Sequence, residues 1–289
     1  MKRALVLGGG GNVGIAWEIG VLAGLADGGV DASEADLVIG TSAGSVVGTQ
    51  LRSGRDPREL LRELQDEQPR ALGDNGHVPD MSVMTETFTL WGSFKEMTPE
   101  ACAQVGALAL KAKTVPEERW ISAFEENGWR GWPERPLLIT AVDCESGEFK
   151  AFDRDSGVPI ATAVAASCSV PAMFPPVTIA GRRYTDGGVR SVTSADLALR
   201  IEPDAVLIIA PMGASDRGVG RVVGNQIERE HEALEASGAS VRRIMFDDAA
   251  REASGGNLMD PTKRRPASSA GYALGSRLAP EMLDWWNGR

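Results

Sequence analysis

The chain has 289 residues, of which 43% are hydrophobic and 24% charged, as is typical of a globular protein with one large or two small domains. Its formal net charge of −10 argues against a nucleic-acid partner, because phosphate backbones would be repelled. Three scattered cysteines indicate a reducing, cytoplasmic location without a disulfide framework or a metal site, and no apolar run is long enough to cross a bilayer.

The N-terminal part predicts two strand–helix units. Residues 4–7 form an apolar strand, a glycine run follows, and residues 15–26 carry apolar side chains at a helical period. The apolar run before the first glycine is too short for a signal peptide. A second strand at 37–39 leads into a helix at 46–51. This alternation predicts parallel strands joined by right-handed crossovers, and therefore an α/β fold.

The glycine run between the first strand and helix supports two functional interpretations. The spacing of Gly9, Gly11 and Gly14 fits a dinucleotide fingerprint, but Gly40 stands where the second strand should end in an acidic residue. Alternatively, the backbone N–H groups of Gly9, Gly10 and Gly11 converge as an oxyanion hole. A tight turn built only for packing explains less, because four consecutive glycines exceed what a turn needs.

A Gly-x-Ser-x-Gly turn joins the second strand to the second helix. Gly40 and Gly44 flank Ser42 and leave room where a Cβ would collide with the neighbouring strand or helix. The helix that follows directs its free N–H groups at the site, which favours developing negative charge. This arrangement predicts that Ser42 is a nucleophile. Taken alone, a motif of this kind is better explained as a small-residue turn before a helix.

Residues 52–135 are less regular. Helices are predicted at 57–68, 98–113 and 116–126, whereas the stretch at 68–94 is rich in Gly, Pro, Met and Thr and is predicted to be irregular. The Met and Trp side chains of this stretch suit a lid or an acyl-chain pocket, but filling a second core under the helices is the more ordinary role for any one of them.

The second half of the chain returns to strands. Its predicted strands lie at 136–142, 148–152, 177–179, 182–185, 205–210 and 241–246, and its predicted helices lie at 159–166 and 219–237 and at the C-terminus. The first two of these strands are separated by a turn and should form a hairpin. A flexible stretch rich in Gly, Ser and Arg is predicted to precede the final helix.

Asp186 follows the strand at 182–185 and, taken alone, is a hairpin-turn residue because a glycine follows it. If Ser42 is catalytic, however, it needs a base within hydrogen-bond reach. The two histidines are poorly placed, since His77 lies in the irregular insertion and His231 in a charged helix that should be exposed. Asp186 is the better candidate, provided that apolar surroundings such as the loop at 170–176 raise its pKa.

Four sequence blocks together resemble the patatin-like phospholipase family. They are the glycine-rich block at 5–14, Gly-Thr-Ser-Ala-Gly-Ser at 40–45, the Ala-Ala-Ser block with its prolines at 165–176, and Asp186-Gly187-Gly188. Each block alone is a weak signal, but all four occur in the family's order. The resemblance covers about residues 4–210.

The resemblance implies a three-layer α/β/α sandwich with a mainly parallel central sheet. A single domain would span 1–289, with a core at about 4–212, a helical insertion at about 65–135 and a C-terminal extension at about 213–289. It also implies that Ser42 and Asp186 form a dyad without histidine, metal or cofactor. The dyad would hydrolyse acyl esters of lipids through an acyl-enzyme. Transient contact with a membrane surface stays open, and no oligomeric state is predicted.

Two positions depart from the family's pattern. Val13 stands where a basic residue is usual, which weakens the expectation of an anionic phospholipid headgroup, and Ser191-Val192 stands where many relatives have Asn-Pro. Two other functions remain as alternatives. A dinucleotide-binding oxidoreductase would use the glycine run, and a catalytically inert scaffold would keep the fold with an unreactive Ser42.

Overall fold

The computed structural model describes residues 1–66, 81–213 and 217–288. The strands are β1 (Arg3–Leu7), β2 (Leu37–Gly40), β3 (Leu137–Asp143), β4 (Phe149–Phe152), β5 (Val177–Ile179), β6 (Arg182–Asp186), β7 (Ala205–Ala210) and β8 (Ser240–Met245). The α-helices are α1 (Gly11–Asp27), α2 (Ala43–Arg52), α3 (Pro57–Asp66), α4 (Met81–Ser93), α5 (Pro99–Lys111), α6 (Glu117–Glu125), α7 (Ile160–Ser167), α8 (Gly218–Ala236), α9 (Asp248–Ser254) and α10 (Arg264–Asn287). Short 3-10 helices are η1 (Ala32–Glu34), η2 (Gly187–Val189), η3 (Ala195–Ile201) and η4 (Pro261–Lys263).

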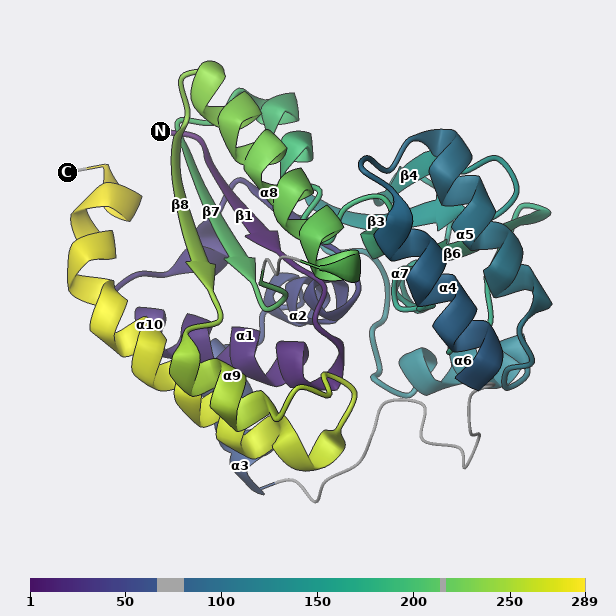
Figure 1. Cartoon of the computed structure of the whole chain (residues 1–289). Coiled ribbons are helices and arrows are strands. Elements are labelled where there is room, and N and C mark those ends of the chain that lie inside the picture. The colour runs from purple at the N-terminus through teal and green to yellow at the C-terminus, as the bar shows by residue number, and fades with distance from the viewer. Residues whose placement is uncertain (67–80, 214–216, 289) are drawn as a thin grey trace.

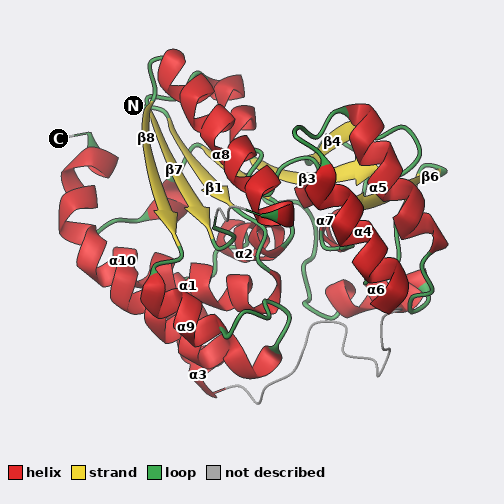
Figure 2. Ribbon diagram, viewed as in Figure 1, coloured by secondary structure: helices red, strands yellow, loops and turns green. Residues whose placement is uncertain are grey.

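A central sheet lies between two layers of helices (Figures 1 and 2). In the described part of the chain the strand order is β5-β6-β3-β2-β1-β7-β8, with β4 also paired to β3. The pairs β1–β2, β1–β7, β2–β3 and β7–β8 are parallel, whereas β4 and β6 run antiparallel to β3, and β5 runs antiparallel to β6. The predicted three-layer sandwich with a mainly parallel sheet is therefore confirmed, as is the hairpin of β3 and β4.

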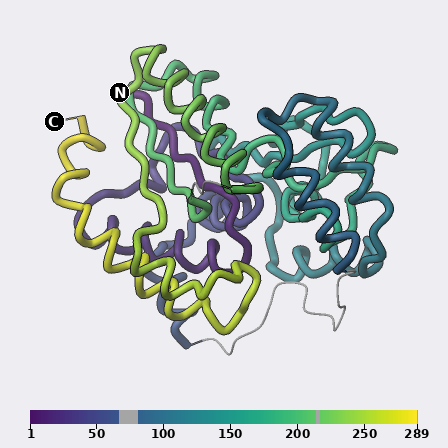
Figure 3. The backbone as a smooth tube through the Cα atoms, in the orientation of Figure 1, coloured from purple at the N-terminus to yellow at the C-terminus, as the bar shows by residue number. Residues whose placement is uncertain are grey.

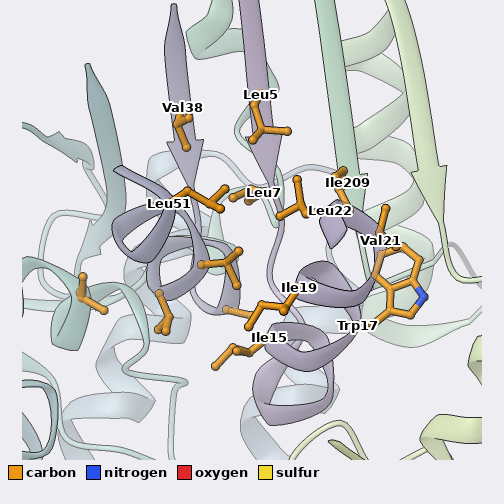
Figure 4. Packing of buried hydrophobic residues seen from close by; sticks show 14 of the residues in the cluster. Leu5, Leu7, Ile15, Trp17, Ile19, Val21, Leu22, Val38, Leu51 and Ile209 are labelled. Carbon is orange, nitrogen blue, oxygen red and sulfur yellow. The ribbon is translucent and has the colours of Figure 1, made fainter. Parts of the chain in front are cut away.

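The central strands are continuous apolar runs because helices cover them on both faces. Successive side chains of a strand point to opposite faces. Leu5 and Leu7 of β1 pack with α1 and α2, as Figure 4 shows, whereas Ala4 and Val6 pack with α8 and η3. This two-sided burial fixes the register of β1 against its neighbours.

Two segments differ from the sequence-based prediction. Helix α4 lies within the stretch predicted to be irregular, and the rest of that stretch, 67–80, lies outside the described residues. Trp91 of α4 is buried in a second core with Met97 and Val105 of the neighbouring segments, so tertiary packing outweighs a weak local helical signal. The segment predicted to be flexible before the last helix contains α9 and the start of α10.

Helix α10 packs along α1 at very short range (Figure 3). Glycines allow this approach. A Cβ built on Gly20 or Gly24 of α1 would lie 2.1 or 2.4 Å from a carbonyl oxygen of α10, and one built on Gly271 or Gly275 of α10 would lie 2.3 or 2.2 Å from a carbonyl oxygen of α1. No larger residue fits without separating the helices. The C-terminal helix is thus bound to the helix that begins at the glycine run.

Replacing Gly275 with valine should destabilise the protein by about 2 kcal/mol or more, because the side chain must displace the backbone of α1. Ala273→Val is the control, since Ala273 is exposed on the same helix and receives the same side chain, and Ala→Val costs helix propensity where Gly→Val does not. Urea denaturation followed by circular dichroism measures both. Equal midpoints for the two variants would contradict the close packing of α1 and α10.

Candidate active site

Ser42 sits at a strained bend between β2 and α2. Its backbone has φ 52° and ψ −117°, a conformation that residues other than glycine rarely adopt. The N–H of Ser42 donates to the Ser167 hydroxyl at 2.9 Å, and the N–H of Gly44 donates to the Gly8 carbonyl at 2.9 Å. These bonds tie the bend to α7 and to the end of β1, so the surrounding structure holds the strained conformation.

The glycines of this bend are required by close contacts. A Cβ on Gly44 would lie 2.0 Å from the Leu7 carbonyl oxygen, and one on Gly40 would lie 2.5 Å from the Gly44 carbonyl oxygen. Gly14 is less tightly enclosed, since its Cβ position lies 3.2 Å from the Pro211 side chain and 3.5 Å from that of Ala43. The glycine spacing seen in the sequence therefore lets β1, α1 and α2 meet around Ser42.

The glycine run lies beside Ser42. A Cβ on Gly9 would be 3.6 Å from the Ser42 Cβ, so Gly9 leaves room next to the hydroxyl. The N–H of Gly9 donates to the Val192 carbonyl at 2.8 Å and is thus already engaged. By contrast, the N–H groups of Gly10 and Gly11, at the start of α1, donate to no residue in the described part of the chain. Free donors at a helix N-terminus favour a negatively charged oxygen.

Asp186 is the last residue of β6, and its carboxyl group is 4% exposed. The carboxylate accepts the N–H of Gly188 at 2.7 Å and lies near the Ser42 hydroxyl. Burial raises the pKa of Asp186 to about 7, while its interactions with the Ser42 hydroxyl and the Gly188 N–H act in the opposite direction. A carboxyl group with this pKa both accepts and returns a proton near neutral pH.

Sheet topology brings these segments together. Because β1 and β2 are parallel neighbours, the glycine run and the Ser42 bend leave the sheet at the same edge. Asp186 reaches this edge from the antiparallel strand β6, paired with Ala141 of β3. The Thr140 hydroxyl is hydrogen-bonded to the Thr41 hydroxyl at 2.7 Å. A Cβ built on Gly187 would lie 2.2 Å from this Thr140 oxygen, so only glycine fits after Asp186.

Thr140 and Ser167 support the site in ways that were not predicted from the sequence. Both residues are fully buried, and the hydroxyl of each is hydrogen-bonded to the bend after β2, which is distant in the sequence. Ser167 lies in the third sequence block, so its position in that block is a signal that could have identified it. Thr140 is one residue of an apolar strand and carries no local signal.

The histidines take no part in the described site. His231 lies on α8, and its Nε2 atom is 3.4 Å from Glu235. Much of α8 around it is exposed, as expected, but the His231 side chain itself is only 16% exposed. His77 lies outside the described residues. Within the described ranges, no three acidic, histidine or cysteine side chains gather as metal ligands.

A narrow apolar cavity of about 30 Å³ opens beside Ser42. Trp120 and Phe124 of α6 form one wall, and Phe174 stacks on Trp120 with ring centroids 4.0 Å apart. Trp120 Nε1 donates to the Ala165 carbonyl at 3.0 Å, which fixes the indole. In the predicted insertion, therefore, α6 contributes to the site while the aromatic side chain of Trp91 on α4 fills a second core.

A family profile described as patatin-like phospholipase matches residues 5–199, which include the glycine run, Ser42 and Asp186. The chain belongs to the patatin-like phospholipase family. Membership of this family supports a lipid-hydrolysing function. A sequence comparison with curated proteins gives no significant match.

Solved structures that resemble this chain include a bacterial protein and a human phospholipase. VipD from Legionella pneumophila is 16% identical with a TM-score of 0.49, covering 97% of this chain and 67% of that one. Human GIVD cytosolic phospholipase A2 is 11% identical with a TM-score of 0.50, covering 99% of this chain and 60% of that one. At 11% identity, the likeness to the human enzyme concerns the fold alone. This patatin-like chain thus spans about two thirds or less of the length of these neighbours.

Val13, where this patatin-like chain departs from the usual basic residue, is fully buried in the main core. Its N–H donates to the Leu258 carbonyl at 3.0 Å. The side chain packs among apolar residues and supplies no charge to the site. In the described part of the chain, none of the helices combines the length and the apolar character that a bilayer span requires.

Proposed function

We propose that this protein hydrolyses carboxylic esters of lipids or small molecules, with Ser42 as nucleophile and Asp186 as general base. The observation that carries the proposal is the buried Asp186 carboxyl group, which lies near the Ser42 hydroxyl and whose pKa is raised to about 7, at a strained bend beside free backbone donors. A serine is a weak nucleophile unless such a base takes its proton.

In the proposed reaction, Ser42 Oγ attacks the ester carbonyl carbon and its proton passes to Asp186. The N–H groups of Gly10 and Gly11 hold the oxyanion of the tetrahedral intermediate. The intermediate collapses, and the alcohol leaves with the proton from Asp186. Water then attacks the acyl-enzyme and gives a proton to Asp186. The second tetrahedral intermediate collapses, Asp186 returns this proton to the leaving Ser42 Oγ, and the carboxylic acid is released. The third predicted donor, Gly9, is assigned the role of leaving space, because Val192 engages its N–H.

The dinucleotide alternative has less support. It requires an acidic side chain after β2 to hold the ribose, but Gly40 ends this strand and the hydroxyl of Thr41 is hydrogen-bonded to Thr140. The inert-scaffold alternative leaves the raised pKa of Asp186 and the strain at Ser42 without a purpose.

Turnover of p-nitrophenyl butyrate and of a lysophospholipid, with EDTA present, tests the proposed function. We expect release of p-nitrophenol and of fatty acid without added metal or nucleotide. In parallel, titration with NAD(P) should show no saturable binding. A folded protein that binds a dinucleotide, or that hydrolyses neither ester, would contradict the proposal.

The size of the cavity predicts the preferred acyl chain. About 30 Å³ holds one or two water molecules, so a long chain requires displacement of the Trp120–Phe174 stack. We expect the wild type to favour acetate and butyrate esters. Trp120→Ala should raise the ratio of octanoate to butyrate kcat/KM by about tenfold or more.

A series of p-nitrophenyl esters with acyl chains of increasing length measures this preference. Trp132→Ala is the matched control, because the Trp132 indole donates to the Val158 carbonyl away from the Ser42 cavity. The control should keep the wild-type profile. An unchanged profile in Trp120→Ala would show that the acyl chain does not occupy this cavity.

A further inference from the structure

The loop that follows Asp186 joins the two halves of the site. Its Val192 carbonyl accepts the N–H of Gly9 at 2.8 Å. On the other side, a Cβ built on Gly188 would lie 3.7 Å from Val192 Cγ1, so the valine side chain lies beside the turn that holds the Asp186 carboxylate. The position of Val192 thus affects both the glycine run and the turn beside the base.

Hydrogen bonds within the chain fix the conformation of this loop. The Ser191 hydroxyl accepts the N–H groups of Thr193 at 3.3 Å and Ser194 at 2.9 Å. Ser194 adopts a left-handed conformation with φ 50°, which side chains rarely favour. The serine that replaces the family's usual asparagine therefore still closes the turn, because a hydroxyl, like an asparagine side chain, can accept backbone N–H groups.

Glu230 of α8 holds the far side of the loop. Its Oε2 atom accepts the Thr193 hydroxyl at 2.5 Å and the N–H of Ala195 at 2.8 Å. Its Oε1 atom accepts the side-chain amide of Gln226 at 3.2 Å and lies 3.8 Å from Arg190. The carboxylate is 2% exposed. A buried carboxylate is costly unless donors surround it, and here two of the donors belong to one loop.

Arg190 completes the cluster on the exposed side. It forms two hydrogen bonds with Asp196 at 2.7 and 2.6 Å, and its guanidinium lies 4.6 Å from the centre of the Phe149 ring. The segment from 190 to 196 is therefore fixed in two ways. Its two ends are joined by the bonds between Arg190 and Asp196, and Glu230 binds Thr193 and Ala195 from outside the segment. Val192 lies between these points.

We propose that Glu230 is a positioning residue for the oxyanion hole. By fixing Thr193 and Ala195 it sets the Val192 carbonyl, which takes the N–H of Gly9. This bond orients the next two peptide groups, so that the N–H groups of Gly10 and Gly11 face the substrate oxygen. Glu230 itself touches no reacting atom. The proposal rests on the proposed function, because it requires an ester carbonyl at Ser42.

Three variants test this role. Glu230→Leu removes both acceptors and should lower kcat for p-nitrophenyl butyrate about 10- to 100-fold, below the loss of about 10²–10³ seen when an oxyanion donor is deleted outright. Thr193→Val removes one donor without unpairing the buried carboxylate and should have a smaller effect in the same direction. Glu230→Gln keeps an acceptor oxygen and should restore most of the activity. Glu228→Gln is the matched control, since Glu228 is exposed on the same helix.

Binding of a trifluoromethyl ketone separates positioning from general destabilisation. This inhibitor forms a tetrahedral adduct with an active serine, so its affinity should fall by the same factor as kcat while KM and the pH midpoint of activity stay at wild-type values. If Glu230→Leu does not fold, Thr193→Val decides by the same measurements.

The two failures are distinguishable. A wild-type protein without ester turnover overturns the proposed function. Wild-type turnover with unchanged kcat and inhibitor affinity in the folded variants overturns only the role of Glu230. A fall in kcat with an equal shift of KM or of the pH midpoint overturns it too, because such a change indicates altered substrate binding or an altered base.

Discussion

Replacing Ser42 with alanine is expected to lower kcat for ester hydrolysis by about 10³-fold or more. The variant lacks the atom that forms the acyl-enzyme, and only binding and oxyanion stabilisation remain, which in other serine hydrolases leave a small residual rate. The change removes one oxygen at a site where the backbone N–H is held by Ser167, so folding should persist. Initial rates with p-nitrophenyl butyrate and thermal denaturation measure the two effects.

Ser53→Ala is the matched control for this loss. Ser53 lies at the other end of α2, is exposed, and donates to the Thr49 carbonyl. Its replacement should leave kcat within a factor of about two, because surface changes of this kind rarely alter the structure. Comparable activity of Ser42→Ala and Ser53→Ala would remove Ser42 from the mechanism.

Replacing Asp186 with asparagine is expected to have the second-largest effect, also about 10³-fold on kcat. The amide can still accept the N–H of Gly188, but it cannot take the proton of Ser42. In the wild type, kcat/KM should rise with pH through about 7, because only the ionised carboxylate acts as base. The asparagine variant should lack this rise.

The stability of the wild type, unlike its activity, should fall relative to that of Asp186→Asn as pH rises. The folded pKa of Asp186 lies above its unfolded value, so its contribution to stability is fully present below the unfolded pKa. That contribution is lost as pH rises through about 7, where burial penalises the charge. The urea midpoint of Asp186→Asn should therefore rise relative to that of the wild type between pH 5 and pH 8. Parallel curves for the two proteins would mean that Asp186 ionises as in water.

The sequence predicted the central strands well because helices cover them on both faces, which makes β1, β2 and β7 continuous apolar runs. It also identified residues that the structure brings together, since the hydroxyl of Ser42 lies near enough to the carboxyl group of Asp186 to lower its pKa. Close backbone contacts explain why glycine spacing was so informative here. The catalytic roles of these residues remain proposals.

Other features depend on contacts between distant segments. The hydrogen bond from Gly9 to Val192 joins residues that are far apart in the sequence, so no local pattern indicates it. All three glycines were therefore predicted as oxyanion donors. Glu230 is one acidic residue in a helix with other charged side chains, and only the fold places it against Thr193. Helix α4 was missed because its packing against α8, rather than its own sequence, stabilises it.

Labelling with a fluorophosphonate, read by intact mass and peptide mapping, tests the central claim most directly. The reagent forms a stable phosphonyl ester only with an activated serine. We predict one adduct on wild-type protein, located on Ser42, absent in Ser42→Ala and formed much more slowly in Asp186→Asn. A folded wild-type protein that gains no adduct, or gains it on another residue, would contradict the assignment of Ser42 as nucleophile and Asp186 as its base.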